Sequence, residues 1–299
     1  MNKTVFSSGG KKHFSINNVF LYMIAVFSAV IILIPILIMI ATAFKTDQEI
    51  SLAGFRWLPK SFFNVDNYVH AWQSGDWLLY FKNSMIVTLC TVVGSLLINS
   101  MAGFAFAKLR FMGKKLLFLI VLGGMMIPSQ AIIIPQFLIL KHFPFAGGNN
   151  LFGIGGIGLL DTYAGLIIPF LSGSFGIFLC RQFYLSFPYE LLEAAKIDGC
   201  SAIKAFFCIF LPNSKQILAT LAILKFVSCW NDYFFPLIIT QSEKMKTIQL
   251  ALQMFNGSTT VHYNWLMAAT LFTSVPMVIV FLVAQKCFVQ GITSTGLKG

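Results

Sequence analysis

The candidates for chemistry in this sequence are polar residues set inside apolar stretches. Lys225 and Asp232 are the clear charges within such a stretch, and Trp230, Asn231 and Tyr233 surround the acid. On a continuous helix, a spacing of seven residues puts Lys225 and Asp232 on roughly one face, about 10 Å apart along the axis. Charges at membrane depth are costly and usually face the interior of a helix bundle or a watery cavity.

Two interpretations of this segment are open. In the first, Asn231 and Asp232 lie on a substrate path near its outer half, where they hydrogen-bond hydroxyl groups of a solute. Trp230 or Tyr233 would then stack on a ring of that solute. In the second, Lys225 and Asp232 are a structural pair that fixes their helix against its neighbours or against a second subunit.

Uncharged polar residues also occur in other apolar stretches, namely Asn99, Gln130, Gln136 and Ser172. Such groups more often hold membrane helices together than bind cargo. Gln136 is retained as a further candidate for the substrate path.

Hydrolytic, metal and P-loop chemistry have no support in the sequence. The four histidines are far apart without an HxxxH pair, the six cysteines show no CxxC spacing, and no Ser/His/Asp set has a recognisable elbow. Residues 153–158 fit GxGxxG, but that fingerprint requires a preceding strand and a following helix. The sequence contains no Walker A motif, so we expect neither a metal nor a nucleotide on this chain.

The composition indicates an integral membrane protein. The chain has 299 residues, of which 57% are hydrophobic and 10% charged, whereas soluble domains carry about 25% charged residues. The net charge of +11 would be compatible with nucleic-acid binding. Lys and Arg also collect in the cytoplasmic loops of membrane proteins, so their positions decide between the two explanations.

Hydropathy predicts six membrane spans, because each needs about 20 mainly apolar residues. The basic flank before the first span resembles a secretory signal, but the apolar run is longer than the roughly 7–15 residues of a signal. We therefore expect an uncleaved first span. Pro128 and Pro135 are expected to bend the third span. The predicted spans are 19–44, 83–107, 116–140, 163–185, 217–240 and 265–283.

The charges follow the positive-inside pattern when the N-terminus is placed in the cytoplasm. The inner segments are then 1–18, 108–115, 181–215 and 286–299, with thirteen Lys and Arg against three acids. The outer segments carry seven bases and six acids. The excess of Lys and Arg is therefore explained by membrane topology, and we expect no nucleic-acid partner. Both termini are expected in the cytoplasm.

The stretch 189–212 combines charges of both signs with apolar residues between the fourth and fifth predicted spans. Its first part favours a short helix that ends at Gly199. Small Ala194 and Ala195 would let another backbone approach closely, and Glu193 offers a charge at the edge of that contact. We expect a plug for a groove on a partner protein; the alternative is a helical loop that packs only on its own bundle.

A second helical piece is expected at residues 202–210. It would present Phe206, Phe207 and Phe210 on one apolar face.

The spacing inside 189–212 resembles the EAA loop of ABC importer permeases: EAA at 193–195, three residues, Gly199, nine residues, and IxLP at 209–212. The WND triplet at 230–232, the ending 290–299 and the count of six spans resemble the maltose-permease-like branch of the carbohydrate uptake family. The residues that the resemblance assigns to ATPase coupling are Glu193, Ala194, Ala195, Asp198, Gly199, Ile209, Leu211 and Pro212.

The resemblance implies an all-α integral membrane protein of the type I ABC importer architecture. Residues 83–289 would form the core permease domain, preceded by a cytoplasmic N-terminus, first span and outer loop in 1–82 and followed by a cytoplasmic tail in 290–299. The implied partners are a second permease subunit, two ATP-binding cassette subunits that carry ATP and Mg, and an extracytoplasmic solute-binding protein. Stretch 189–212 would carry motion of the ATPases into spans three to six, in a prokaryotic cell membrane.

The resemblance also implies a sugar as cargo, with an oligosaccharide favoured, whereas glycerol phosphate and amino sugars are carried by close relatives. A secondary transporter or channel is the main alternative class, with 189–212 as a linker. Inverted repeats and a titratable relay in the spans would favour it, and we find neither. For Glu193, a direct contact with the ATPase and a cap on its own helix are both open.

Overall fold

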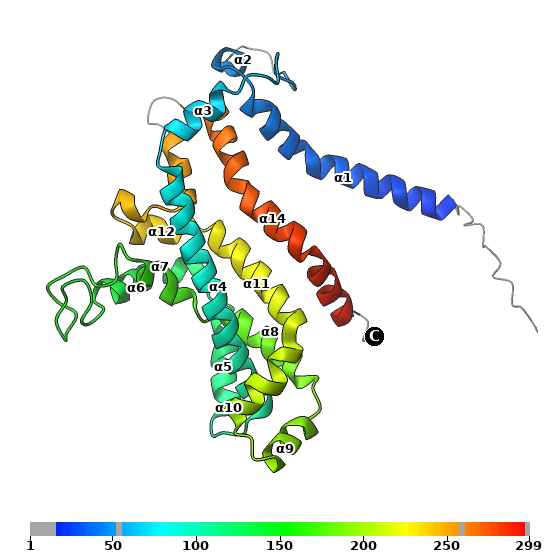
Figure 1. Ribbon diagram of the computed structural model, residues 1–299, viewed down its shortest axis with the longest axis vertical. Helices are drawn as coiled ribbons and strands as arrows, with labels where there is room; N and C mark the ends of the chain where they lie inside the picture. Colours follow the sequence, from blue (N-terminus) through cyan, green and yellow to red (C-terminus); the bar gives the residue numbers. More distant parts are fainter. Residues whose placement is uncertain (1–15, 52–55, 257–260, 297–299) are drawn as a thin grey trace, which may run out of the picture. The chain divides into compact units, whose positions relative to one another are not determined.

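The computed structural model describes residues 16–51, 56–256 and 261–296. Regular structure in this part of the chain is helical, apart from one isolated antiparallel bridge between Asn256 and Val261 (Figure 1). The longer helices are α1 (Ile16–Ala43), α3 (Asp66–Gln73), α4 (Trp77–Lys108), α5 (Lys114–Gly124), α6 (Ser129–Lys141), α8 (Ser174–Leu185), α9 (Glu190–Ile197), α11 (Lys215–Trp230) and α14 (Tyr263–Gly296). The short ones are α2 (Asp47–Ser51), α7 (Tyr163–Ile167), α10 (Ala202–Ala205), α12 (Phe234–Ile239), α13 (Ile248–Leu252), a π-helix (Phe206–Phe210) and four 3₁₀ turns (Ile168–Phe170, Pro212–Ser214, Glu243–Met245 and Gln253–Phe255).

The described residues contain up to six apolar helical spans, which agrees with the hydropathy prediction. Three are continuous helices: Phe20–Ala43, Trp77–Lys108 and Tyr263–Gln285. The other three are helix pairs: α5 with α6 at 106°, residues 163–170 with α8 at 44°, and residues 202–210 with 212–230 at 46°. The third span is bent, as the sequence predicted, and the fourth is broken where a single helix was predicted. The fifth pair begins at residue 202 and ends at Trp230, so the predicted bounds of 217–240 are wrong for this span.

The sharpest bend corrects one detail of the prediction. It lies between α5 and α6, where Pro128 is extended and immediately precedes α6, as expected for a residue that cannot continue a helix. Pro135 lies inside α6, away from the break between the two helices.

The chain divides into two compact units. In the unit of residues 1–71 and 262–271, the buried Asn67 donates to the carbonyls of Ala43 and Lys45 at 2.8 Å each. Asn264 donates to the Asn67 amide oxygen at 3.0 Å. These amides join the end of α1 to α3 and to the start of α14.

In the unit of residues 72–261 and 272–299, α4 packs along α8 and α11 (Figure 1). Gly103 permits the contact with α8, because a Cβ there would come within 2.5 Å of the Cys180 Cβ and 2.8 Å of the Arg181 nitrogen. Asn99 on α4 accepts from the Gly173 N–H at 2.9 Å. It thereby satisfies backbone exposed at the break before α8, as a membrane interior requires.

Candidate coupling site and substrate path

The EAA loop, defined here as residues 189–212, begins with the amphipathic helix α9. Leu192 and Ala195 are buried on its inner face, while Glu193 and Ala194 are exposed. Ile197 is 86% exposed, at the end of the outer face. Of the two alanines of the motif, only Ala194 is therefore open to a close approach from outside, and Ala195 belongs to the core of this chain.

Glu193 accepts no hydrogen bond from the described residues. It lies in the first turn of α9, where a carboxylate interacts favourably with the helix dipole. The residue before the helix, Tyr189, makes no side-chain capping bond either. The structure therefore gives no support to the helix-cap alternative for Glu193.

Helix α9 ends in a Schellman motif around Gly199. The Cys200 N–H donates to the Ala195 carbonyl at 2.8 Å and the Gly199 N–H to that of Lys196 at 3.0 Å. Gly199 has φ +75°, in the left-handed region that favours glycine. A Cβ on Gly199 would meet no atom of this chain within 4 Å. The fold of this chain therefore requires glycine at position 199 because of its backbone conformation, and not because a side chain would lack room. Asp198, the preceding residue, is exposed.

The second half of the EAA loop continues as α10 and the π-helix. The Leu211 N–H donates to the Phe206 carbonyl at 2.8 Å, five residues back. This wide turn directs Phe206 and Phe210 into the core, where both are at most 2% exposed, and leaves Phe207 43% exposed. The expectation of one apolar face with all three rings is thus wrong for Phe207.

The IxLP end of the motif leads from the π-helix into α11. Ile209 and Leu211 are half-buried against the core, and Pro212 is exposed at the start of a 3₁₀ turn. Proline is suited to the first turn of a helix because its missing N–H would be unpaired there.

One continuous core anchors the EAA loop to three spans. Phe104 of α4, Tyr184 of α8 and Leu221 of α11 share this core with residues of the loop. The ring of Phe104 lies 5.4 Å from that of Phe206 and 4.8 Å from that of Phe210. Span two, which contains Phe104, therefore shares a core with the EAA loop, whereas the sequence reasoning connected the loop to spans three to six. The loop members of the core are Leu192, Ala195, Ala205, Phe206 and Phe210.

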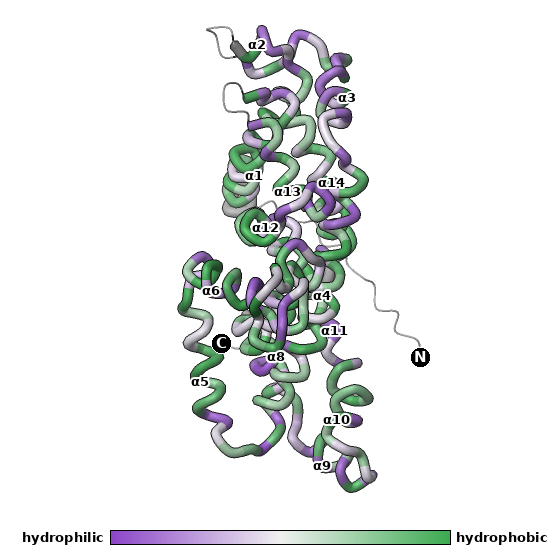
Figure 2. Tube along the Cα trace, turned by 90° about the vertical axis from the view of Figure 1, so that its left-hand side faces the viewer, coloured by the Kyte–Doolittle hydropathy of each residue, from purple (hydrophilic) through white to green (hydrophobic). Residues whose placement is uncertain are grey.

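Basic residues surround the root of the EAA loop. Lys108 donates to the Phe187 carbonyl at 2.5 Å, and Arg181 to the Phe106 carbonyl at 3.3 Å. The Arg181 guanidinium also lies 4.0 Å from the ring centre of Phe118. Figure 2 shows the polar residues of this region gathered around α9 and the turn before α5, while α5 itself is mostly apolar.

The substrate-path candidates lie at a break in the fifth span and not on one helix face. Helix α11 ends at Trp230, so residues 231–233 form a connection to α12. Lys225 and Asp232 interact electrostatically, but no ion pair within 4 Å joins them among the described residues. The Lys225 ammonium lies 5.4 Å from the ring of Phe170. The assumption of a continuous helix between the two charges is therefore wrong.

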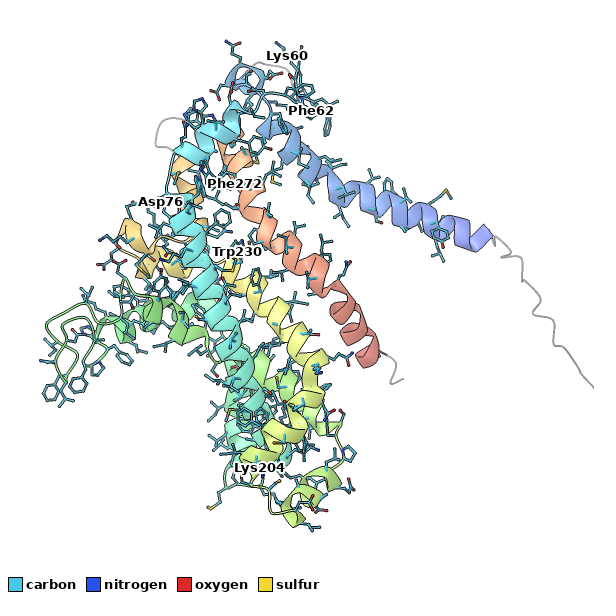
Figure 3. All side chains as sticks on the ribbon, viewed as in Figure 1. Lys60, Phe62, Asp76, Lys204, Trp230 and Phe272 are labelled. Carbon is cyan, nitrogen blue, oxygen red and sulfur yellow. The ribbon has the colours of Figure 1, made fainter. Side chains whose placement is uncertain are left out.

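Trp230 is packed inside the protein. It is 2% exposed, its ring stacks on Phe226 with centroids 5.5 Å apart, and its indole N–H donates to the Thr273 carbonyl at 3.2 Å. Figure 3 shows Trp230 and Lys204 toward opposite ends of the segment 202–230. In this conformation the indole face is not open to a solute, which leaves Tyr233 as the candidate for stacking on a ring.

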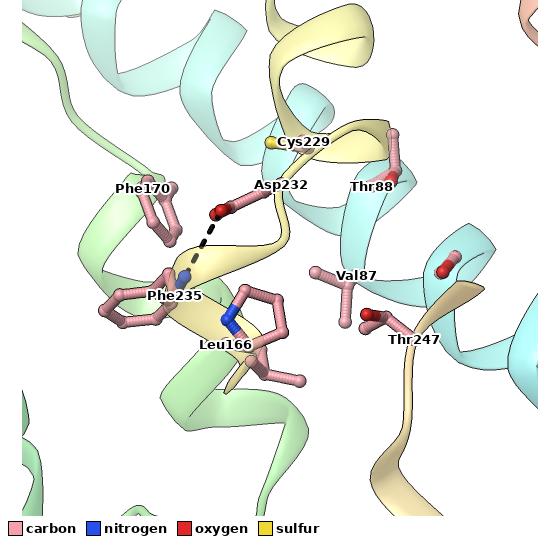
Figure 4. Close-up of a pocket in the computed structure, with 10 residues that line it drawn as sticks. Val87, Thr88, Leu166, Phe170, Cys229, Asp232, Phe235 and Thr247 are labelled. Carbon is pink, nitrogen blue, oxygen red and sulfur yellow. Dashed lines mark hydrogen bonds between the residues drawn. The ribbon is translucent and has the colours of Figure 1, made fainter. Parts of the chain in front are cut away.

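Asp232 lines a cavity of about 20 Å³ (Figure 4). One carboxylate oxygen accepts from the Phe235 N–H at 3.3 Å. The Thr88 and Thr247 hydroxyls also line the cavity, and neither has a hydrogen-bond partner among the described residues. This volume suits a single water molecule, whereas ligand pockets occupy roughly 300–1,000 Å³. The geometry favours a structural role for Asp232.

A larger groove, of about 340 Å³, lies beside Tyr233. Asn231 does not line this groove; it accepts from the Gln249 amide at 3.4 Å and donates to the Met277 sulfur at 3.3 Å. Gln136 is half-buried on α6 and lines neither cavity. The groove is lined by Tyr233, Leu237, Thr240, Gln241, Ser242, Lys246, Leu250, Gln253 and Met254.

Sequence reasoning did not identify the residues that hold this groove in place. Asn83 on α4 donates to the carbonyls of Lys244 and Lys246 at 2.9 and 2.8 Å. Asp161 accepts from the N–H groups of Gln241 and Ser242 at 2.9 and 3.0 Å. Asn83 begins a predicted span and Asp161 lies in a loop. Nothing in the sequence at either position indicated contacts with residues 241–246, some 80 to 160 residues away.

The described residues thus form a helical bundle with broken spans and a charged helical element rooted across three of them. Residues 95–294 match the family described as "Binding-protein-dependent transport system inner membrane component". The chain belongs to this family, and it is a permease subunit of a binding-protein-dependent ABC transport system.

Curated relatives support the assignment over nearly the whole chain. It is 35% identical over 282 residues to the probable ABC transporter permease protein YurM of Bacillus subtilis (strain 168), covering 94% of this chain and 86% of YurM. It is 30% identical to the arabinooligosaccharides transport system permease protein AraQ of the same organism, covering 96% and 98%. The sn-glycerol-3-phosphate transport system permease protein UgpE of Yersinia pestis bv. Antiqua (strain Antiqua) is 29% identical, covering 93% and 96%.

The fold also matches a solved transporter. A bacterial ABC transporter involved in the import of the acidic polysaccharide alginate has a chain that superposes with a TM-score of 0.74 at 24% identity, over 95% of this chain and 99% of that one.

Proposed function

We propose that this chain is one permease subunit of an importer for a sugar, with an oligosaccharide as the favoured cargo. It works by alternating access with a second, different permease subunit, two ATP-binding cassette subunits that bind ATP and Mg, and an extracytoplasmic solute-binding protein. Both termini lie on the cytoplasmic side of a prokaryotic cell membrane.

The observation that carries the coupling role is the two-sidedness of the EAA loop. Its inner residues share a core with α4, α8 and α11, while Glu193, Ala194 and Ile197 are exposed on the opposite side. Force applied to the exposed side would move a packed cluster that spans three membrane segments, since packed cores respond as units. The basic turn at 108–115 begins beside the root of the EAA loop, where Lys108 donates to the Phe187 carbonyl, and basic turns collect on the cytoplasmic side of membrane proteins.

Among the candidate cargoes, the groove beside Tyr233 favours a neutral sugar over a phosphate ester. Lys246 is the one cation among the described residues that line it, and Glu243 pairs with that ammonium at 2.5 Å. Phosphate recognition usually uses Arg or several donors together. Tyr, Thr, Ser and Gln side chains instead supply neutral hydrogen bonds and an aromatic face, which suit sugar hydroxyls and rings.

The test is purification of the tagged chain from its native membranes, followed by reconstitution with its co-purified partners. We expect a second permease and an ATPase to co-purify, and binding-protein-dependent uptake of an oligosaccharide to require ATP. Uptake by the chain alone, driven by an ion gradient, would overturn the importer assignment. Uptake of glycerol phosphate in preference to sugars would overturn only the cargo.

A further inference from the structure

The loop between α6 and α7, defined here as the Gly-Asn loop (residues 142–160), has apolar side chains on its outside. Phe145, Phe152 and Ile154 are 78%, 79% and 64% exposed. No charged residue occurs from 143 to 160. A loop in water would normally present polar side chains, so this surface calls for an apolar neighbour.

Two asparagines satisfy backbone groups in and beside the Gly-Asn loop; Asn149 is buried and Asn150 is exposed. Asn149 donates to the carbonyls of Lys141 and Phe143 at 2.8 and 3.0 Å and accepts from the Gly156 N–H at 2.8 Å. Asn150 accepts from the N–H groups of Phe152 and Ile154 at 2.9 and 3.0 Å.

Close backbone approach within the Gly-Asn loop requires glycine. At Gly147, which has φ +54°, a Cβ would lie 2.2 Å from the Gly158 carbonyl oxygen. Internal pairing of backbone groups is what a segment needs where water is scarce, since unpaired groups are costly there.

Helix α4 gives the depth of this loop in the membrane. Leu140 and Leu160, at the two roots of the loop, share a core with Val87 of α4, and the Leu159 N–H donates to the Leu140 carbonyl at 2.8 Å. From Val87 to Lys108, at the basic end of α4, a helix rises about 32 Å at 1.5 Å per residue. The hydrocarbon core of a bilayer is about 30 Å thick. The roots of the loop therefore lie at the membrane boundary opposite to Lys108.

We propose that the Gly-Asn loop is a lipid anchor that inserts its apolar side chains among the phospholipids of the outer leaflet. The exposed apolar side chains of α6, Ile134 and Ile139 at 69% and 65%, continue its surface into the adjoining membrane segment. The anchor would fix the depth of the sharply bent α5–α6 pair in the membrane.

Photo-crosslinking in intact membranes tests the anchor. Phe152→p-benzoylphenylalanine replaces one aromatic side chain by another, and Ile154→p-benzoylphenylalanine is a second position in case the first variant does not fold. After illumination, we expect adducts between the full chain and phospholipid as the main product. The control is Ile197→p-benzoylphenylalanine on the exposed side of α9, where we expect several-fold less lipid adduct.

A main adduct to the second permease subunit or to the binding protein would overturn the lipid anchor, as would equal lipid labelling at Ile197. The inference needs only that α4 crosses the bilayer; the topology proposed above decides that the leaflet is the outer one. Lipid adducts would still form if the importer function or its orientation were wrong, so the two failures can be told apart.

Discussion

The rings of Phe104 and Phe210 lie 4.8 Å apart and inclined by 55°, and this contact joins span two to the end of the EAA loop. Phe104 is 3% exposed and Phe210 is fully buried. A movement of the loop would therefore be felt by α4 directly, without passing through the third span. If the EAA loop has the proposed coupling role, α4 receives the motion of the loop directly.

Phe210→Ala is expected to remove this contact and leave a cavity, at a cost of about 3–5 kcal/mol in the free energy of unfolding. Phe207→Ala is the matched control in the same π-helix, and we expect it to change stability by no more than about 0.5 kcal/mol because Phe207 is exposed. Denaturation of the purified protein in detergent measures both. Equal losses in the two variants would contradict the inward direction of Phe210.

Gly103→Val is expected to separate α4 from α8, because the new side chain would meet the backbone nitrogen of Arg181. Overpacking of this kind costs about 1–3 kcal/mol. Gly123→Ala, near the end of α5, has no atom within 4 Å of its new Cβ and is expected to be neutral or slightly stabilising. The melting temperatures of the two variants check the pair; a stable Gly103→Val protein would show that the helices are not in close contact.

Tyr233→Ala is expected to affect transport, whereas Asp232→Asn is expected to affect stability. Because Tyr233 lines the 340 Å³ groove, its truncation should raise the KM for uptake several-fold at unchanged protein yield. Asp232 lines a cavity of about 20 Å³, so its amide variant should change thermal stability and leave cargo preference unaltered. A changed cargo preference in Asp232→Asn would restore this carboxylate to the substrate path.

Asp161 is expected to make stability dependent on pH in the acidic range. Burial raises the pKa of its carboxyl, but hydrogen bonds from Ser242 and Gln241 outweigh burial and hold the pKa below its ordinary value of 3.8. The ionised form is thus favoured in the folded state. Its contribution to stability is complete above pH 3.8 and is lost as the pH falls through the lower, folded-state pKa.

Asp161→Asn should remove this acid-dependent loss while tolerating the left-handed backbone at φ +55°. Melting temperatures of the variant and the natural chain across the acidic range measure the effect. Identical pH profiles for the two proteins would contradict the role of the carboxylate.

The sequence predicted the helical membrane class and the six spans, because hydropathy over 20 residues reports burial in lipid directly. It predicted a bend at Pro128, but it did not predict the breaks at 171–173 and 231–233. Those depend on partners far along the chain, such as Asn99, whose side chain satisfies the backbone at Gly173. Motif spacing likewise predicts that the EAA loop is present, but not which of its residues face the core and which are exposed. Ala194 and Ala195 are neighbours of one type, and only the packed helix separates the exposed residue from the buried one.

The Gly-Asn loop illustrates the same limit. The predicted spans leave only a connection at its glycines and asparagines, because composition does not reveal which side chains are exposed. The asparagines pair with backbone groups in and beside the loop, and Phe145, Phe152 and Ile154 are exposed.

The most direct measurement of the central claim is ATPase binding by Ala194→Tyr. Ala194 is exposed on α9, so a large side chain there should leave the melting temperature of the permease within about 1 °C of the natural chain, in line with a near-neutral surface change. We expect this folded variant to lose co-purification of the ATPase and ATP-dependent uptake. Full ATPase binding and uptake by Ala194→Tyr would contradict the coupling role of the EAA loop.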